Sequence, residues 1–476
     1  MIIVVDFIRD LPSLDNNLQI FSSFISTDNR DHPNQSSISV LYFSMGTENS
    51  SYIIPINHID KHPRSDITVD SIFHWIMSSS DYSSLFVSNS KKWRQYFSTK
   101  KDPTGDNIAS KLIDVDIVGY LSSGKVSMTS NDISSRYSQY YSKFFNSPGD
   151  INTIIPIGIL SDYLHTHTQS IRNEYDENNQ LAKERNITQV SVDGYGFYFN
   201  KIIPVATWLE FDGIHIDLTK ISNQSDSLLY PQYHLYNKTG RWSNNFGGIN
   251  FSAIPKNSNL RKAMTSRFGD DGMIVLIDYE AFHPRLISTI IGNKFPNDIS
   301  VYEFIKRSCF EDQSITVDQA KIKTLQMLYG NDVEPELKDE IGFFSKVHEL
   351  KNSLWDEYKK NNGWILSPKS LRPIYIPMTE KTTPSFIFSY WVQALEMEWS
   401  VGRLEMVKNY PYNKKLVKLL LYTYDSILLD ISKKGDYNTA ITEIVSLLSN
   451  LGEFPMRVYT GTSYDNVVYD DRWSNL

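Results

Sequence analysis

Cysteine is nearly absent from the sequence: Cys309 is the only one in 476 residues. A single cysteine excludes an internal disulfide and a metal cluster built from cysteines, and it is typical of a reducing compartment. Long hydrophobic runs are absent too, because no stretch of roughly 18 apolar residues occurs, and we therefore expect no membrane span. The opening residues, MIIVVDFIRD, are too acidic for a signal peptide and predict a first β-strand. These features predict a cytoplasmic protein.

A global excess of positive charge is also missing. Lysine and arginine number 47 against 55 aspartates and glutamates, so the formal net charge is -8. No overall basic field therefore points to nucleic acid, although a local basic cleft could still bind it within an acidic total. The apolar content of 41% and the charged content of 21% are those of an ordinary globular protein. The length leaves room for about two to four domains and a large core.

The chain alternates between strand-like and helical segments. Residues 1–60 carry β-strand patterns and residues 70–96 carry helical ones, so we expect an α/β layer at the start of the chain. Residues 159–190 predict a helix with a charged tail. Residues 218–250 are rich in Ser, Asn and Gly with few apolar residues, which predicts a long functional loop.

Three local signals stand out, and the first is an apolar run, MIVLI, that leads directly into Asp278. The pattern then becomes helical, with Phe282 and Arg285 about one turn apart. A buried strand that ends in a carboxylate, directly before a helix, would deliver a negative charge to the edge of a sheet.

The second signal is TVDQAKIKTLQMLYGND, residues 316–332. Thr316 and Gln319 form a Thr-x-x-Gln capping box, which predicts the start of a helix. Such a helix could hold a phosphate, a sugar and a base, although an ordinary amphipathic helix with an exposed lysine shows the same pattern. One face carries a cation, an apolar residue and an aromatic residue at intervals of four: Lys321, Leu325 and Tyr329.

The third signal is LVKLLLYTYDSILLDIS, residues 416–432, which predicts a β-hairpin with Asp425 at its tip. An aspartate in a turn is ordinary on its own. Two aspartates at the ends of buried strands can, however, lie side by side at one sheet edge, where they would repel and require cations. Mg²⁺ prefers such oxygen ligands, and two Mg²⁺ ions about 3.5–4 Å apart support phosphoryl transfer. The helix with Lys321 would bring positive charge to the phosphates.

Together these motifs resemble those of the family A DNA polymerases, the DNA polymerase I group that includes many phage enzymes. The family's first motif, Asp-Tyr-Ser-x-x-Glu-x-Arg, is similar to DYEAFHPR at 278–285. The second, Lys-x-x-x-aromatic-x-x-x-Tyr-Gly, is similar to the segment from Lys321 to Gly330, and the third, His-Asp-Glu, to the YDS that contains Asp425. Three further segments match in the expected order: TGRWSNNFGGINFSAIP at 239–255, WILSPKSLRPIYIP at 364–377 and SYWVQALEME at 389–398.

The resemblance implies a role for each matching residue. Asp278 and Asp425 would be the ligands of two Mg²⁺ ions, together with the backbone carbonyl of Tyr279. Lys321 would bind the triphosphate, and Tyr329 would pack near the templating base and the entering nucleotide. The remaining matches would contact template, nucleotide, minor groove or the nucleic-acid backbone: Arg241, Arg261, Gln393 and Arg372.

Several positions depart from the family pattern, and four of them bear on the expected roles. The glutamate that checks the sugar is replaced by His283, whose bulk would still exclude a 2′-hydroxyl. The aromatic of the second motif is Leu325, and the arginine expected before the lysine is Val317, so sugar stacking and the triphosphate clamp would both be weaker. The third-motif glutamate is Ser426, a change that leaves the two aspartates in place.

Residues 1–150 resemble the 3′–5′ exonuclease-like domain that precedes many of these polymerases, and the segment SSYIIPINHID carries the likeness. An active site of that type needs about four carboxylates to bind two metal ions. Only Asp6 and Asp162 would remain, because Ile8 and Trp93 occupy the other positions. The resemblance therefore implies a degenerate exonuclease site without proofreading.

The resemblance also implies a right-hand polymerase of α/β and α+β domains with an RNase H-like domain in front. The short stretch from Asp217 to Thr239 leaves little room for the helices of a thumb, so we expect low processivity and an accessory processivity factor. The expected division is an exonuclease-like domain at 1–150, a linker and reduced thumb at 151–238, a palm at 239–285 and 365–476, and fingers at 286–364.

We therefore expect a template-directed DNA polymerase that uses primer-template DNA and dNTPs, encoded by a phage and working in a bacterial cytoplasm. Two alternatives stay open. Ser426 and Leu325 are also typical of single-subunit RNA polymerases, although the Thr-Gly-Arg segment resembles the DNA enzymes. The other alternative is an inactive relative that binds nucleic acid, and the retention of Asp278, Asp425 and Lys321 argues against it.

Overall fold

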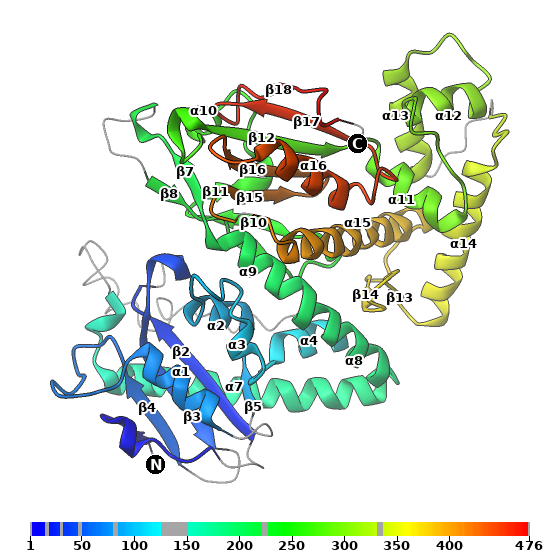
Figure 1. Cartoon of the computed structure of the whole chain (residues 1–476). Coiled ribbons are helices and arrows are strands. Elements are labelled where there is room, and N and C mark those ends of the chain that lie inside the picture. The colour runs from blue at the N-terminus through cyan, green and yellow to red at the C-terminus, as the bar shows by residue number, and fades with distance from the viewer. Residues whose placement is uncertain are drawn as a thin grey trace. The chain divides into compact units, whose positions relative to one another are not determined.

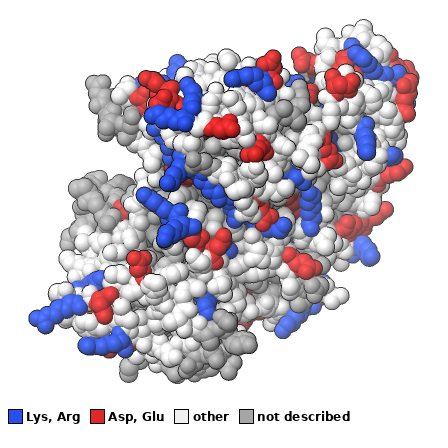
Figure 2. Space-filling view, viewed as in Figure 1, with Lys and Arg blue, Asp and Glu red and all other residues white. Residues whose placement is uncertain are grey.

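The computed structural model divides into two units, Met1–Phe211 and Asp212–Leu476, here called the N-terminal and C-terminal units. The structure describes residues 2–14, 19–28, 32–45, 50–79, 84–124, 151–220, 227–330, 337–412 and 414–474. Within these residues, no helix combines the length and the apolar composition that crossing a bilayer requires. On the face seen in Figure 2, positive and negative side chains are interspersed over each unit, as the small net charge leads one to expect.

A six-stranded sheet organises the N-terminal unit, with the strand order β1-β4-β3-β2-β5-β6 (Figure 1). The neighbours β2, β3 and β4 are antiparallel, whereas β5 and β6 run parallel to β2. Every residue of β3 is buried, so this strand lies in the core. The strands are β1 (Ile2–Val4), β2 (Gln19–Ser26), β3 (Ile38–Met45), β4 (Ser51–Pro55), β5 (Ser84–Val87) and β6 (Leu112–Asp114).

Helix α7 (Ile157–Glu184) packs on β2 and β3 of this sheet through a cluster that includes Leu160 and Leu164. This packing places the segment from 151 to 211 in the N-terminal unit, so the expected boundaries at 150 and 238 differ from the observed division at 211. The expected helices at 70–96 and 159–190 are present. The other helices of this unit are α1 (Val69–Ser78), α2 (Ser90–Tyr96), α3 (Asp106–Ala109), α4 (Val115–Ser123), α8 (Thr188–Phe197) and α9 (Ile203–Phe211).

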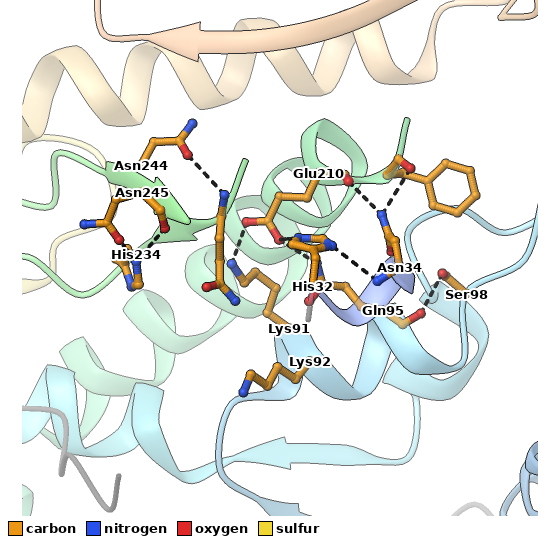
Figure 3. Close-up of polar contacts among 12 residues, drawn as sticks. His32, Asn34, Lys91, Lys92, Gln95, Ser98, Glu210, His234, Asn244 and Asn245 are labelled. Atoms are coloured by element: carbon orange, nitrogen blue, oxygen red, sulfur yellow. Dashed lines mark hydrogen bonds and ion pairs between the residues drawn. The ribbon is translucent and has the colours of Figure 1, made fainter. Parts of the chain in front are cut away.

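A buried glutamate near the end of α9, Glu210, links that helix to α2 (Figure 3). The side chain of Glu210 is fully buried and accepts hydrogen bonds from Lys91 Nζ at 2.6 Å and Gln95 Nε2 at 2.5 Å, both on α2. The ring of His32 lies 3.7 Å from the same carboxylate. Burial alone would raise the pKa of Glu210, but Lys91 and His32 outweigh it and hold the pKa below its ordinary value.

A five-stranded antiparallel sheet forms the centre of the C-terminal unit, with the order β15-β16-β12-β17-β18. The apolar run before Asp278 is the central strand, paired on both sides. The strands are β12 (Gly272–Tyr279), β15 (Val417–Thr423), β16 (Ser426–Ser432), β17 (Met456–Gly461) and β18 (Val468–Tyr469). The expected hairpin at 416–432 is confirmed, since β15 and β16 pair in antiparallel with Asp425 in the turn.

Seven α-helices accompany this sheet among the described residues of the unit. The long helix α15 (Pro384–Asn409) is buried along its middle and packs on α16 (Tyr437–Leu448). The rings of Tyr279, Phe282 and Trp399 meet with centroids 4.2–5.5 Å apart, which fixes the end of β12 on α15. Figure 1 shows α12, α13 and α14 beyond the end of β12. The remaining helices are α11 (Phe282–Ile291), α12 (Val301–Cys309), α13 (Val317–Tyr329) and α14 (Phe343–Lys360), together with the short α10 (Asn259–Ala263).

The expected long loop at 218–250 is instead partly strand. Tyr233 and Trp242 are buried, and the ring of Trp242 lies 5.7 Å from that of Tyr422 in the central sheet. Local periodicity missed these strands because each is only two to four residues long and its burial comes from contacts with a distant sheet. The small strands here and nearby are β7 (Ile214–Ile216), β8 (Ser227–Leu229), β9 (Tyr233–His234), β10 (Ser243–Phe246), β11 (Ile249–Asn250), β13 (Trp364–Leu366) and β14 (Pro373–Tyr375).

Glu210→Gln should lower the free energy of unfolding of the N-terminal unit by about 3–5 kcal/mol, because it leaves the buried Lys91 without a carboxylate. Urea unfolding at neutral pH measures this difference. The contribution is full above the unfolded pKa of 4.5 and is lost as pH falls through the lowered folded pKa, so the two proteins should converge in acid. Glu177→Gln, at an exposed position of α7, is the control and should change little. Equal stability of Glu210→Gln and the unmodified protein would contradict this account.

Candidate active site

Asp278 lies near the end of the central strand β12 and lines a cleft. Its neighbours across the sheet are Ser426 on β16 and Arg457 on β17. The strand ends one residue later, at Tyr279, and Ala281 then adopts a left-handed conformation, with φ of 49°, directly before α11. The expected change from buried strand to helix around the carboxylate is therefore present.

Asp425 occupies the turn between β15 and β16, beside the end of β12. Its backbone carbonyl accepts a hydrogen bond of 2.9 Å from the backbone N–H of Tyr279. The residue before it, Tyr424, is also left-handed, with φ of 63°. Both aspartates line the same cleft, so the turn and the strand end meet as the sequence predicts.

The two left-handed residues, Tyr424 directly before Asp425 and Ala281 three residues after Asp278, are strained, because neither is glycine. A left-handed conformation costs an L-residue about 1–2 kcal/mol. Such strain persists where the surrounding structure overdetermines the backbone, and it concentrates at functional sites. Sheet pairing on both sides of β12 and the stacked rings of Tyr279 and Phe282 supply that support for Ala281.

The electrostatic environment disfavours two negative charges here. Burial, and next the nearby Asp425, raise the pKa of Asp278 to about 7, while Arg457 and Lys321 act in the opposite direction. The exclusion of water by the cleft, and next Glu396, raise the pKa of Asp425 as well. The nearby cations offset this only in part, so added positive charge would favour the ionised forms of the pair.

The donor set fits a hard divalent cation. Carboxylates and backbone carbonyls are the ligands that Mg²⁺ prefers, and Mg²⁺ usually takes only one or two carboxylates and fills its other positions with water or phosphate oxygens. Asp278, Asp425 and the carbonyl of Tyr279 provide this combination at one end of the sheet. Across the part of the chain that the structure describes, no cluster of three or more His, Cys, Asp or Glu side chains could hold a metal by itself.

Helix α13 forms the opposite wall of the cleft. The capping box is confirmed, because the Thr316 hydroxyl accepts from the N–H of Gln319 and the Gln319 side chain accepts from the N–H of Thr316. Lys321 is exposed and lines the cleft together with Leu325. The cleft has a volume of about 360 Å³ and is lined by acidic, basic and aromatic residues that include Tyr302, His283, Glu396 and Arg241.

A chain of polar contacts joins three residues that line the cleft to Tyr329, which lies outside its lining. The hydroxyl of Tyr329 lies 2.5 Å from Nδ1 of His283, and Nε2 of the same ring lies 3.0 Å from Glu396. Nη2 of Arg241 lies 2.9 Å from Glu396 and its guanidinium stacks 3.9 Å above the ring of Tyr424. Three of the expected residues are thus connected. His283 and Arg241 contact Glu396 directly, and Tyr329 contacts His283.

Sequence reasoning missed Glu396. The available signal was the segment WVQALEMEWSV, in which two glutamates stand inside an apolar helix. A carboxylate in such a place is buried and needs partners. Both Glu396 and Glu398 are 1% exposed, and Glu398 accepts from the N–H groups of Lys369 and Ser370 on the side away from the polar chain.

Arg372 is not placed to contact a nucleic-acid backbone, which corrects the expectation from the sequence. It is 1% exposed, and its guanidinium donates to the carbonyl of Lys238 at 3.4 Å. Gly240 is left-handed, with φ of 77°, and a Cβ there would lie 2.5 Å from Nη2 of Arg372. Arg372 therefore holds the segment that presents Arg241, and this contact requires glycine at 240.

Two other expected contacts lie outside the lining of the cleft. Arg261 on α10 donates through Nε to the carbonyl of Ile254 at 3.1 Å and stacks 4.0 Å above the ring of Tyr464. Gln393 is half-buried on α15, one turn before Glu396. Their expected contacts with nucleotide and minor groove stay predictions.

In the N-terminal unit, Asp6 follows the edge strand β1 and Asp162 is exposed on α7. Neither belongs to a metal-binding cluster among the described residues. Trp93, which stands where the resemblance calls for a carboxylate, is 1% exposed and packs in the core. Two other carboxylates of this unit, Asp114 and Asp116, are buried and accept from backbone N–H groups at the start of α4 and α2.

Comparisons with known proteins bear on the fold. No family model matches the sequence, and no curated protein matches it. A solved structure of the POL domain of Pol1 from M. smegmatis, in complex with DNA primer-template and dNTP, superposes with a TM-score of 0.64 at 12% sequence identity. The superposition covers 94% of this chain and 96% of that one. The chain therefore has the fold of a DNA polymerase domain.

Proposed function

We propose that this protein is a template-directed DNA polymerase of the family A type, which adds dNTPs to the 3′ end of a primer. The observation that carries the proposal is the pairing of Asp278 with Asp425 in a cleft whose opposite wall presents Lys321. The polymerase fold supports it, because the comparison structure holds primer-template and dNTP. The proposed setting is phage genome replication with an accessory protein, which fits the short segment between Asp217 and Thr239.

The proposed reaction joins the primer to the nucleotide at one phosphorus atom. The 3′-oxygen of the primer bonds to the α-phosphorus, the bond from that phosphorus to the bridging oxygen breaks, and pyrophosphate leaves. The proton of the 3′-hydroxyl goes to solvent. Asp278, Asp425 and the carbonyl of Tyr279 would hold two Mg²⁺ ions, whose chemistry is to activate the attacking oxygen and stabilise the leaving one.

Side chains around the aspartates match the parts of a nucleotide. Lys321 is exposed on α13 and would neutralise the triphosphate, with Arg457 on β17 as a second cation close enough to act on Asp278. His283 and Leu325 line the same cleft, and we propose that the sugar lies against them. Tyr329 would then pack near the templating base and the entering nucleotide, and Arg241 would contact the nucleic acid.

The N-terminal unit is proposed to lack proofreading activity. Two-metal hydrolysis of a DNA end needs a cluster of carboxylates, and Asp6 and Asp162 are its only proposed survivors. Asp162 is exposed on a helix and Asp6 follows an edge strand, which gives neither of them a partner in a metal cluster of the described residues.

The first prediction concerns extension. On a primed DNA template with Mg²⁺, the protein should extend the primer with dNTPs, and Asp425→Asn should slow extension by about a hundredfold or more, as loss of a preorganised charge-stabilising group does. Asp271→Asn is the matched control, because Asp271 is exposed at the opposite end of β12 and pairs with Lys434 at 2.8 Å. Extension with rNTPs alone would favour the RNA polymerase alternative, and no extension by the unmodified protein would contradict the proposal.

The second prediction concerns stability without metal. At pH 8 the Asp278 carboxyl is above its pKa of about 7 and is ionised beside Asp425. Asp278→Asn should therefore stabilise the metal-free protein by about 1 kcal/mol, or about 2–4 °C in the unfolding temperature, while abolishing extension. Differential scanning calorimetry in EDTA measures the shift. Addition of Mg²⁺ should stabilise the unmodified protein more than the variant, and a variant that is less stable in EDTA would argue against charge repulsion.

The third prediction concerns the N-terminal unit. A 3′-labelled single strand incubated with the protein and Mg²⁺ should stay intact over the time in which a primer is fully extended. Asp6→Ala should behave like the unmodified protein in this assay. Mg²⁺-dependent trimming that disappears in Asp6→Ala would overturn the proposed loss of proofreading.

A further inference from the structure

The carboxylate of Glu396 is buried at the floor of the cleft and joins elements that are far apart in the sequence. It is 1% exposed on α15. Its partners are His283 on α11, 113 residues away along the chain, and Arg241, 155 residues away. The His283 ring in turn contacts Tyr329 on α13, so one carboxylate connects three helices with the segment before β10.

The direction of each hydrogen bond follows from this carboxylate. An ionised carboxylate only accepts, so Nε2 of His283 carries the hydrogen that it donates to Glu396 at 3.0 Å. Burial, and next Glu396 itself, raise the pKa of Tyr329, which keeps its hydroxyl protonated. The Tyr329 hydroxyl can then donate to Nδ1 of His283 at 2.5 Å. Both ring nitrogens are engaged, so the tautomer and the plane of the imidazole are set together.

Arg241 completes the arrangement on the other side of the carboxylate. Its Nη2 lies 3.0 Å from one oxygen of Glu396 and 2.9 Å from the other. The guanidinium stacks on Tyr424, the residue directly before Asp425. Both oxygens of Glu396 are thereby engaged by protein donors, and a sugar hydroxyl that entered the cleft would have to compete with them.

We propose that Glu396 is a positioning residue for the choice of deoxyribonucleotides over ribonucleotides. It acts through His283: the carboxylate holds the imidazole against Tyr329, and the fixed ring leaves no space and no unengaged acceptor for a 2′-hydroxyl. A hydroxyl that is buried without a partner is strongly disfavoured, whereas a ring that could rotate would make room for it. This inference rests on the proposed polymerase function.

The chain offers a matched control on the same helix. Glu398 is equally buried, but it accepts from Lys369 and Ser370 and has no contact with the polar chain. Loss of either carboxylate should weaken the packing of α15, so a structural effect would be common to both. Only Glu396 should affect the choice of sugar.

The test measures kcat/KM for one dNTP and the matching rNTP on the same primed template, with the unmodified protein and with E396A, E396Q, H283A and E398Q. E396A should lower the ratio of dNTP to rNTP efficiency by about tenfold or more, mostly through better use of the rNTP. E396Q should lower the ratio less, because its amide oxygen can still accept from His283. E398Q should leave the ratio unchanged even if both rates fall.

A double variant separates action through His283 from a general disturbance. If Glu396 acts through the imidazole, E396A should lower the ratio no further in the H283A background. An unchanged ratio in E396A, or in E396Q if E396A does not fold, would overturn this inference and leave the polymerase function standing. Equal ratios for E396A and E398Q would also overturn it. Failure of the unmodified protein to extend with either nucleotide would overturn the polymerase function and this inference together.

Discussion

The burial of two carboxylates, Asp278 and Asp425, in one cleft is the constraint on which the candidate site of the C-terminal unit depends. Burial raises the pKa of both carboxyls, to about 7 for Asp278. The second cause is Asp425 at Asp278 and Glu396 at Asp425, so added positive charge would favour the ionised forms. Pairing of β12 on both sides and the ring stack of Tyr279, Phe282 and Trp399 hold the strand end in place nonetheless. One end of the central strand therefore carries two clustered carboxylates that bound cations would stabilise, as the proposed phosphoryl-transfer site requires.

Two buried glutamates stabilise the geometry of the two units in the same physical way. Glu210 collects donors from α2 in the N-terminal unit, and Glu396 collects Arg241 and His283 in the C-terminal unit. A buried ion pair adds little net stability, because desolvation offsets the attraction, but loss of one partner leaves an unpaired charge inside. Such groups therefore specify which elements meet more than how tightly they bind. Glu396 lines the cleft, so the elements that it joins there carry residues of the candidate site.

Much of the local structure was predictable because it depends on neighbours a few residues apart. The capping box of α13 needs only Thr316 and Gln319, and the hairpin needs two apolar runs around Asp425, and both are present. Where a prediction was wrong, the missing information was burial. Arg372 looks from the sequence like a cation available to nucleic acid, yet it lies inside and bonds to the carbonyl of Lys238. The segment at 218–250 forms short strands because Trp242 packs on a distant sheet.

The sequence by itself determined three local elements of the C-terminal unit: the strand that ends at Asp278, the capped helix that carries Lys321 and the hairpin that carries Asp425. Hydrophobic periodicity and capping act within one turn or one strand, so local sequence is enough for them. Only the tertiary structure decided that residues 151–211 join the N-terminal unit, that Arg372 is buried, and that Glu396 holds His283 and Arg241. The physical reason is distance along the chain. These contacts join residues more than a hundred positions apart, and close packing of whole elements, which no local pattern encodes, selects which of them meet.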